Sequence, residues 1–76
     1  MKINLPKGFK LVINYEDRYI LAYNVNEDAV QPWVVWSVGL DGRPHTGRYY
    51  GKRQCAEKKF AELCFNWFVM EEEVDR

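Results

Sequence analysis

The amino-acid sequence predicts an α+β domain in which one antiparallel meander of three to four strands is packed on one face by a single C-terminal helix. Residues 9–50 are rich in β-branched and aromatic side chains, and turn-forming residues divide them into four runs. From residue 53 onward the apolar residues recur with the helical period of about 3.6 residues. The predicted order is therefore β-β-β-β-α, with the helix on one side of the sheet.

The chain is long enough for one domain only. Its 76 residues bury a thin core, which three Trp, five Tyr and four Phe side chains make heavier. An apolar content of 47% at zero net charge argues against an intrinsically disordered segment. We divide residues 1–76 into an N-terminal arm (1–8), an antiparallel sheet (9–50), a helix (53–70) and an acidic tail (71–76).

The first two strands are predicted at Phe9–Tyr15 and Tyr19–Asn24. The first alternates apolar and polar side chains, as a half-buried strand does. The polar residues 16–18 between the two runs indicate a tight hairpin. A longer loop over 25–32, with Asn, Asp and Pro as turn formers, follows the second strand.

The third strand, Trp33–Val38, is almost entirely β-branched or aromatic. Asp41-Gly42 then marks a hairpin, because Gly accepts a positive φ at little cost. The fourth strand is predicted at Thr46–Tyr50, and Gly51 ends it.

The helix is predicted from about Gln54 to Met70, with fraying through residues 71–73. Three glutamates at a helix C-terminus face the negative end of the helix dipole, which favours fraying. One apolar stripe is expected to pack on the sheet, and it consists of Ala56, Phe60, Leu63, Trp67 and Met70, with Cys64 beside it.

Alternation along the strands assigns side chains to two sheet faces. The face that we expect the helix residues Phe60, Leu63 and Trp67 to cover carries Phe9, Leu11, Ile13, Val34, Trp36, Val38 and Tyr49. The opposite face then carries Lys10, Val12, Trp33, Val35, Arg48 and Tyr50. Alternation leaves open which of residues 19–24 point toward the helix.

The sequence holds no motif for catalysis or for a metal. His45 is the single histidine, and Ser37, the only serine, lies inside a predicted strand rather than in a strained turn. The cysteines supply no closely spaced ligand pair, and the glycines are spread over turns instead of forming a phosphate-binding loop. We expect a protein that is not an enzyme and that needs no cofactor and no metal.

A cytoplasmic protein without membrane association is expected. No apolar run approaches the roughly 18–20 residues of a membrane span, and residues 1–7 lack the apolar stretch of a secretion signal. Cys55 and Cys64 are nine residues apart in one helix, so they lie about 13 Å apart and cannot form a disulfide. Two free thiols are typical of a reducing compartment.

The charges are distributed unevenly along the chain. Residues 43–59 contain six of the eleven basic residues and one acidic residue, whereas residues 60–76 contain five acidic residues and one basic residue. One interpretation of the basic segment is a surface for a nucleic-acid backbone, beside Tyr49 and Tyr50. The other is a solvated surface or a protein contact. The basic residues concerned are Arg43, Arg48, Lys52, Arg53, Lys58 and Lys59.

Two groups of side chains exceed what one helix on one sheet can cover. On the expected open sheet face these are Trp33, Arg48 and Tyr50, residue types that dominate interface energetics. On the helix they are Phe65, Phe68 and Val69, which lie away from the core stripe. Three interpretations stay open for the sheet face: a partner site, self-association as a homodimer, and cover by the N-terminal arm.

The order of motifs in residues 33–61 resembles known sheet-plus-helix modules. Trp33-Val34-Val35-Trp36, Asp41-Gly42-Arg43, Gly47-Arg48-Tyr49-Tyr50 and a helix with Ala56, Phe60 and Ala61 are similar to the latter part of AP2-type domains. The same order resembles the N-terminal arm-binding domain of transposon integrases. The resemblance implies a sheet in the DNA major groove, with contacts from Trp33, Arg43 and Arg48. The whole chain also resembles small proteins of phages and mobile elements, which often bind and block a host protein.

Two functions are therefore expected from the sequence. The first is a small non-enzymatic binding module that acts on a protein partner as an inhibitor or adaptor of phage or mobile-element type. The second is a DNA- or RNA-binding module that uses the basic segment 43–59 and the open sheet face.

Overall fold

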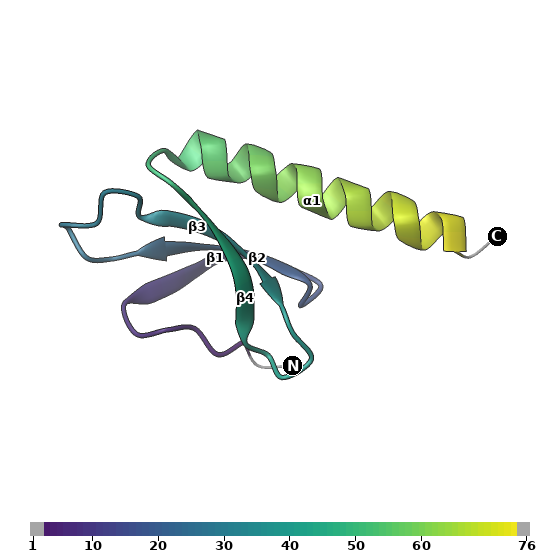
Figure 1. Cartoon of the computed structure of the whole chain (residues 1–76), viewed down its shortest axis with the longest axis horizontal. Helices are drawn as coiled ribbons and strands as arrows, with labels where there is room; N and C mark the ends of the chain where they lie inside the picture. Colours follow the sequence, from purple (N-terminus) through teal and green to yellow (C-terminus); the bar gives the residue numbers. More distant parts are fainter. Residues whose placement is uncertain (1–2, 75–76) are drawn as a thin grey trace.

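The computed structural model describes residues 3–74, with side chains through Met70. It contains a four-stranded sheet and one helix, as the sequence predicts (Figure 1). The strands are β1 (Phe9–Tyr15), β2 (Tyr19–Asn24), β3 (Trp33–Val38) and β4 (Pro44–Tyr50), and the helix is α1 (Arg53–Val74). The first three strands begin and end at the predicted residues, whereas β4 begins two residues before Thr46.

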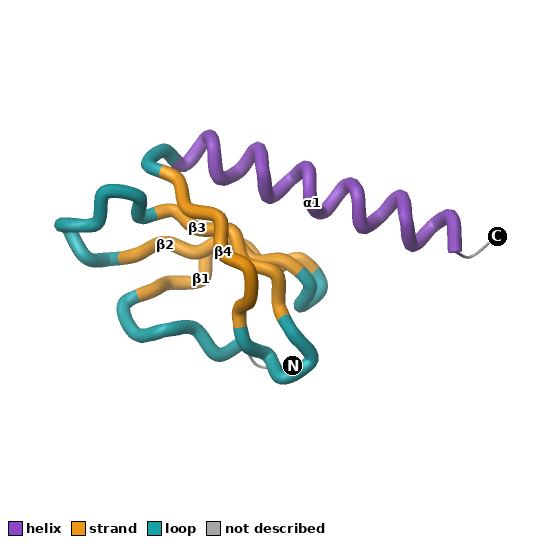
Figure 2. Tube along the Cα trace, in the orientation of Figure 1, coloured by secondary structure: helices purple, strands orange, loops and turns teal. Residues whose placement is uncertain are grey.

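The sheet is an antiparallel meander with the strand order β1-β2-β3-β4. The turns of the β1–β2 and β3–β4 hairpins are short, whereas a longer loop over 25–32 joins β2 to β3 (Figure 2). In the first hairpin, Glu16 and Asp17 adopt φ values of 48° and 56°, and the N–H of Arg18 donates to the carbonyl of Tyr15 at 2.8 Å. The Asn14 side chain stabilises this turn, because its Oδ1 accepts the N–H of Asp17 at 3.0 Å.

The second predicted hairpin is also confirmed. The N–H of Gly42 donates to the carbonyl of Gly39 at 3.0 Å, and Gly42 has a φ of 78°. Only glycine reaches this left-handed region without steric cost, so the Asp-Gly pair selects the turn. The carboxylate of Asp41 closes it further by accepting the N–H of Arg43 at 2.9 Å.

The predicted covered face is wrong, because α1 packs on the opposite side of the sheet. The buried cluster beneath α1 contains Leu21, Val35, Ala56 and Phe60, with half-buried side chains around it. Those surrounding side chains are Val12, Tyr15, Tyr19, Trp33, Tyr50, Leu63 and Cys64. The face with Trp33 and Tyr50, expected to be open, is therefore the helix side of the sheet.

A β-bulge in β1 interrupts the alternation of its side chains between the two sheet faces. Leu11 pairs with Ala22 and Ile13 pairs with Leu21, so one extra residue of β1 lies between two consecutive residues of β2. A bulge of this kind shifts the residues after it to the other face. As a result Leu11 pairs with Ala22 of the face away from the helix, whereas Ile13 pairs with Leu21 of the helix-side cluster and Tyr15 packs against that cluster. Leu11 and Ile13 are both exposed.

The other sheet face is covered by the N-terminal arm. A second buried cluster of Ile20, Ala22, Val34 and Trp36 packs there against the half-buried side chains Ile3, Leu5, Phe9 and Val38. Backbone hydrogen bonds hold the arm at both ends, from the N–H of Asn4 to Gly42 and from the N–H of Val25 to Gly8, each 2.9 Å long. The domain therefore has three layers: arm, sheet and helix (Figure 1).

The helix is longer than predicted and extends beyond the sheet. It continues to Val74 instead of ending at Met70, and its C-terminal end projects past the β1–β2 hairpin (Figure 1). Glutamate is a good helix former, which outweighs its unfavourable interaction with the dipole. Within residues 3–74, no helix combines the length and apolar character that a membrane crossing requires.

Candidate interaction surface

Trp33 is one of the side chains that hold the helix to the sheet. Its ring lies 4.5 Å from the ring of Tyr23, measured between centroids. The guanidinium of Arg53 lies 5.2 Å from the Trp33 ring centroid, and Arg53 Nε also contacts Glu57 Oε2 at 3.0 Å. Cation–π contacts of this geometry stabilise by roughly 0.5–1 kcal/mol at exposed sites. Trp33 therefore fixes the start of α1.

Arg48 and Tyr50 share this helix side of the sheet. Arg48 pairs with Val35 and Tyr50 pairs with Trp33, and directly paired residues of antiparallel strands point to the same face. Both side chains are half-buried, and Tyr50 packs against the helix-side cluster. Three of the six predicted partner-binding residues thus lie beside the helix rather than on an open platform.

A contact at Trp67 holds the middle of the helix against the β1–β2 hairpin. The guanidinium of Arg18 lies over the Trp67 ring, 4.7 Å from its centroid. Arg18 follows the turn residues Glu16 and Asp17, so the hairpin places it toward α1. Sequence analysis did not single out Arg18, because nothing in a short polar turn indicates which distant ring it meets.

Beyond this contact the apolar side chains of α1 lie largely in solvent. Met70 belongs to the predicted core stripe, yet it is 60% exposed because the sheet does not extend beneath it. Its assignment to the core was wrong. Phe65 and Phe68 are 65% and 54% exposed, which agrees with their predicted position away from the stripe. Large exposed apolar side chains gathered on one element mark contact sites.

The helix side opposite the core stripe is called the outer face here. At 100° per residue it comprises Lys58, Ala61, Glu62, Phe65, Phe68 and Val69. All of these are exposed except Val69, which is half-buried. The outer face thus joins the three remaining predicted partner-binding residues, Phe65, Phe68 and Val69, into one continuous surface.

The basic segment 43–59 does not form one patch. Arg43 precedes β4, whereas Lys52 and Arg53 follow it, so the length of this seven-residue strand, about 20 Å, separates them. The two ends of β4 are visible in Figure 1 at the β3–β4 turn and at the start of α1. Residues that are neighbours in the sequence are therefore divided between two ends of the molecule.

Ion pairs also offset part of the basic charge. Arg53 pairs with Glu57, and Lys59 Nζ lies 3.1 Å from Glu62 Oε1. Arg43 Nε lies 4.0 Å from Asp41 Oδ2. A carboxylate beside each of these cations reduces the field that a phosphate backbone would meet. The resulting surface is less basic than the sequence count of residues 43–59 indicates.

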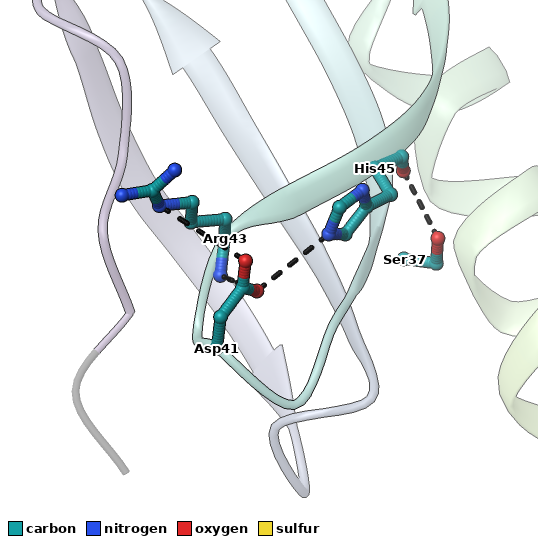
Figure 3. A network of polar contacts seen from close by, with 4 residues as sticks. All are labelled: Ser37, Asp41, Arg43 and His45. Atoms are coloured by element: carbon teal, nitrogen blue, oxygen red, sulfur yellow. Dashed lines mark hydrogen bonds and ion pairs between the residues drawn. The ribbon is translucent and has the colours of Figure 1, made fainter.

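The β3–β4 turn carries a small polar network (Figure 3). Asp41 Oδ1 accepts the Arg43 N–H and lies 3.6 Å from His45 Nε2. The hydrogen bond from the Arg43 N–H, with lesser contributions from His45 and the Arg43 charge, lowers the pKa of the Asp41 carboxyl below its usual value. Ser37 Oγ donates to the backbone carbonyl of His45 at 3.0 Å.

This network brings together Ser, Asp and His but not in a catalytic arrangement. A nucleophilic serine needs its hydroxyl hydrogen-bonded to the imidazole, whereas the Ser37 hydroxyl donates to a main-chain oxygen. Among the residues that the structure describes, no group of three or more His, Cys, Asp or Glu side chains could hold a metal ion.

The two cysteines are free, as predicted from their spacing. Cys55 is exposed on the first turn of α1. Cys64 is half-buried against the helix-side cluster, and burial raises the pKa of its thiol. A raised pKa lowers the fraction of reactive thiolate, so Cys64 is a packing residue.

Comparison of the chain with protein-family models, with curated proteins and with solved structures finds no match. The resemblance to AP2-type and integrase modules stays a prediction. Two of the DNA contacts that it implies, Trp33 and Arg48, lie on the helix side of the sheet, and Arg43 lies at the β3–β4 turn.

Proposed function

We propose that this protein is a small non-enzymatic interaction module that binds protein through the outer face of α1, as an adaptor or inhibitor. The single observation that carries the proposal is the exposure of Phe65 and Phe68 on a helix whose opposite side is already packed on the sheet. Two exposed Phe rings one turn apart form an apolar surface, and burying this surface against a partner is favourable. Helices with such a face bind protein grooves or other helices.

The alternative, a nucleic-acid-binding module, has less support from the geometry. The basic residues are spread from the β3–β4 turn along β4 to the first turns of α1, and three of them are paired with carboxylates. Proteins that bind nucleic acid gain most of their affinity from a continuous basic surface. A titration of duplex DNA at low salt would detect such a surface, because phosphate contacts weaken steeply as salt rises.

The proposal also places the protein in the cytoplasm. The support is the pair of free thiols, Cys55 and Cys64, of which Cys55 is exposed. An exposed thiol persists in a reducing compartment and is oxidised elsewhere.

Affinity capture from the cell extract of the source organism tests the binding function. The bait proteins are the wild type, a variant with Phe65→Lys and Phe68→Lys, and the control Leu40→Lys. Leu40 is 94% exposed in the β3–β4 turn, so the control makes the same chemical change away from α1. We expect a protein that is retained by the wild type and the control and lost from the helix variant. Equal retention by all three baits, or none by any, contradicts the function.

A further inference from the structure

We propose that the outer face of α1 binds a second copy of this chain, with the two α1 helices antiparallel about a twofold axis at Phe65. This inference rests on the proposed function and names its partner. A twofold dimer uses the same surface on both copies, so each exposed side chain near the axis is covered by its own symmetry mate or a neighbour of it.

The charges along α1 select the antiparallel orientation. On the outer face the N-terminal part of α1 carries Lys58, whereas the last turn of the helix is formed by residues 71–74, of which three are glutamates. A parallel pair of helices would bring glutamates beside glutamates and lysines beside lysines. An antiparallel pair brings Lys58 of each copy to the level of the glutamate-rich last turn of the other, and the twofold axis repeats this at both ends.

The register follows from where the exposed aromatic side chains lie. With Phe65 on the axis, positions 58 and 72 of the two copies come to the same height, because each is seven residues, or about 10.5 Å, from Phe65. The sequence has Lys58 at the first position and Glu72 at the second. Both positions are within about 20° of Phe65 around the helix, so they belong to the same face.

The middle of this face has complementary sizes. Ala61 and Phe68 are both exposed and lie on the same flank of Phe65. Antiparallel pairing about Phe65 places Ala61 of one copy near Phe68 of the other, so a small side chain faces a large one. This allows the helix axes to approach to about 8–10 Å, as packed helices usually do.

The sheet does not block this arrangement. α1 packs on β2, β3 and β4 with the side opposite to Phe65, so a second helix approaches from the free side (Figure 1). With Phe65 on the axis, residues 56–74 of the two helices overlap, so a contact strip about 27 Å long and about 10 Å wide covers roughly 300 Å² on each copy, which is smaller than a standard stable interface. We therefore expect a weak dimer, with a dissociation constant of about 10–100 µM.

Sedimentation equilibrium over about 10–500 µM measures the predicted dimer directly. Phe65→Lys is expected to give a folded monomer, since the residue is exposed and makes no core contact. Leu40→Lys is the matched control and should dimerise like the wild type. Circular dichroism confirms that each variant is folded. A wild type that stays monomeric at the highest concentration overturns the inference, and so does a dimer that Phe65→Lys leaves intact.

Charge reversal at positions 58 and 72 tests the register. Lys58→Glu and Glu72→Lys should each weaken the dimer by about tenfold, because each change places two like-charged pairs across the interface. The double variant restores opposite charges at both ends and should return to the wild-type constant. If the single reversals leave the constant unchanged, the antiparallel register is wrong.

The outcomes separate this inference from the proposed function. A wild-type monomer that still captures a foreign protein through Phe65 and Phe68 overturns the dimer and keeps the binding function. A dimer insensitive to Phe65→Lys, together with capture that is equally insensitive, overturns both.

Discussion

The guanidinium of Arg18 lies 4.7 Å from the centroid of the Trp67 ring, and this contact marks where α1 leaves the sheet. On one side of it Phe60 and Leu63 pack on strands. On the other side Phe68 and Met70 are largely in solvent. The helix is thus divided into a part that packs on the sheet and a part that projects beyond it. The outer face extends from the first part into the second.

The Arg18–Trp67 contact gives the first prediction. Arg18→Ala should lower the free energy of unfolding by about 0.5–1 kcal/mol, the usual contribution of an exposed cation–π pair. Urea denaturation measures the loss. Arg43→Ala, at an exposed arginine with no ring contact among the described residues, is the control and should be close to neutral. Equal effects of the two substitutions would show that the Arg18–Trp67 contact does not contribute to the free energy of unfolding.

The arm gives the second prediction, because it is the layer that sequence analysis left undecided. Leu5→Ser should lower the free energy of unfolding by about 1–2 kcal/mol, since Leu5 is half-buried against the cluster around Trp36. Lys7→Ser, at an exposed position of the same arm, should change it little. Unchanged thermal unfolding of the Leu5 variant would mean that the arm does not cover the sheet.

The third prediction concerns a bulge in β4: Arg48 pairs with Val35 and His45 pairs with Ser37, so two residues of β4 lie opposite the single residue Trp36 of β3. Thr46 adopts a φ of 50°, which is unfavourable for a β-branched residue, and Gly47 follows it. Thr46→Gly should therefore raise the free energy of unfolding by up to about 1 kcal/mol. Gly47→Ala should lower it, because a Cβ there would lie 2.7 Å from Trp36 Nε1. Thermal unfolding of the two single variants measures these opposite shifts, and a change of the same sign in both contradicts the bulge geometry.

The fourth prediction is a pH dependence at the β3–β4 turn. The pKa of the Asp41 carboxyl is lowered in the folded state, chiefly by the hydrogen bond from the Arg43 N–H. Its contribution to stability is therefore complete above the unfolded pKa of about 3.9 and is lost as the pH falls through the lower folded pKa. The difference in stability between the wild type and Asp41→Asn should shrink over that range. A titration by NMR that places the Asp41 pKa at or above the ordinary value would contradict this.

Strand positions followed from the sequence because local signals determine them. A few consecutive residues are enough to indicate the turn at Asp41-Gly42. The same holds for β3, which is indicated by its run of β-branched residues. The side of the sheet that α1 covers is a non-local choice, and Val34 and Val35 are equally apolar neighbours that point to opposite faces. With both faces apolar, alternation identifies two faces but does not say which one receives the helix.

The candidate site was likewise predictable only where local patterns determine it. The exposure of Phe65 and Phe68 follows from helical periodicity alone. The roles of Trp33 and Tyr50 beside the helix depend on the choice of face, and that of Met70 depends on where the sheet ends. These are relations between distant segments, so no pattern within one segment contains them.

Intermolecular disulfide formation tests the central claim, that two copies pair through the outer face of α1. Cysteine is introduced at position 65 or at position 58 in a chain with Cys55→Ser and Cys64→Ala. On the axis of an antiparallel pair, two Cα atoms at position 65 lie about 4–6 Å apart, within disulfide range. The two Cα atoms at position 58 lie about 20 Å apart. The account predicts rapid cross-linking of Phe65→Cys and none of Lys58→Cys. Cross-linking at both positions would indicate a parallel pair, and absence of cross-linking at position 65 would contradict the claim.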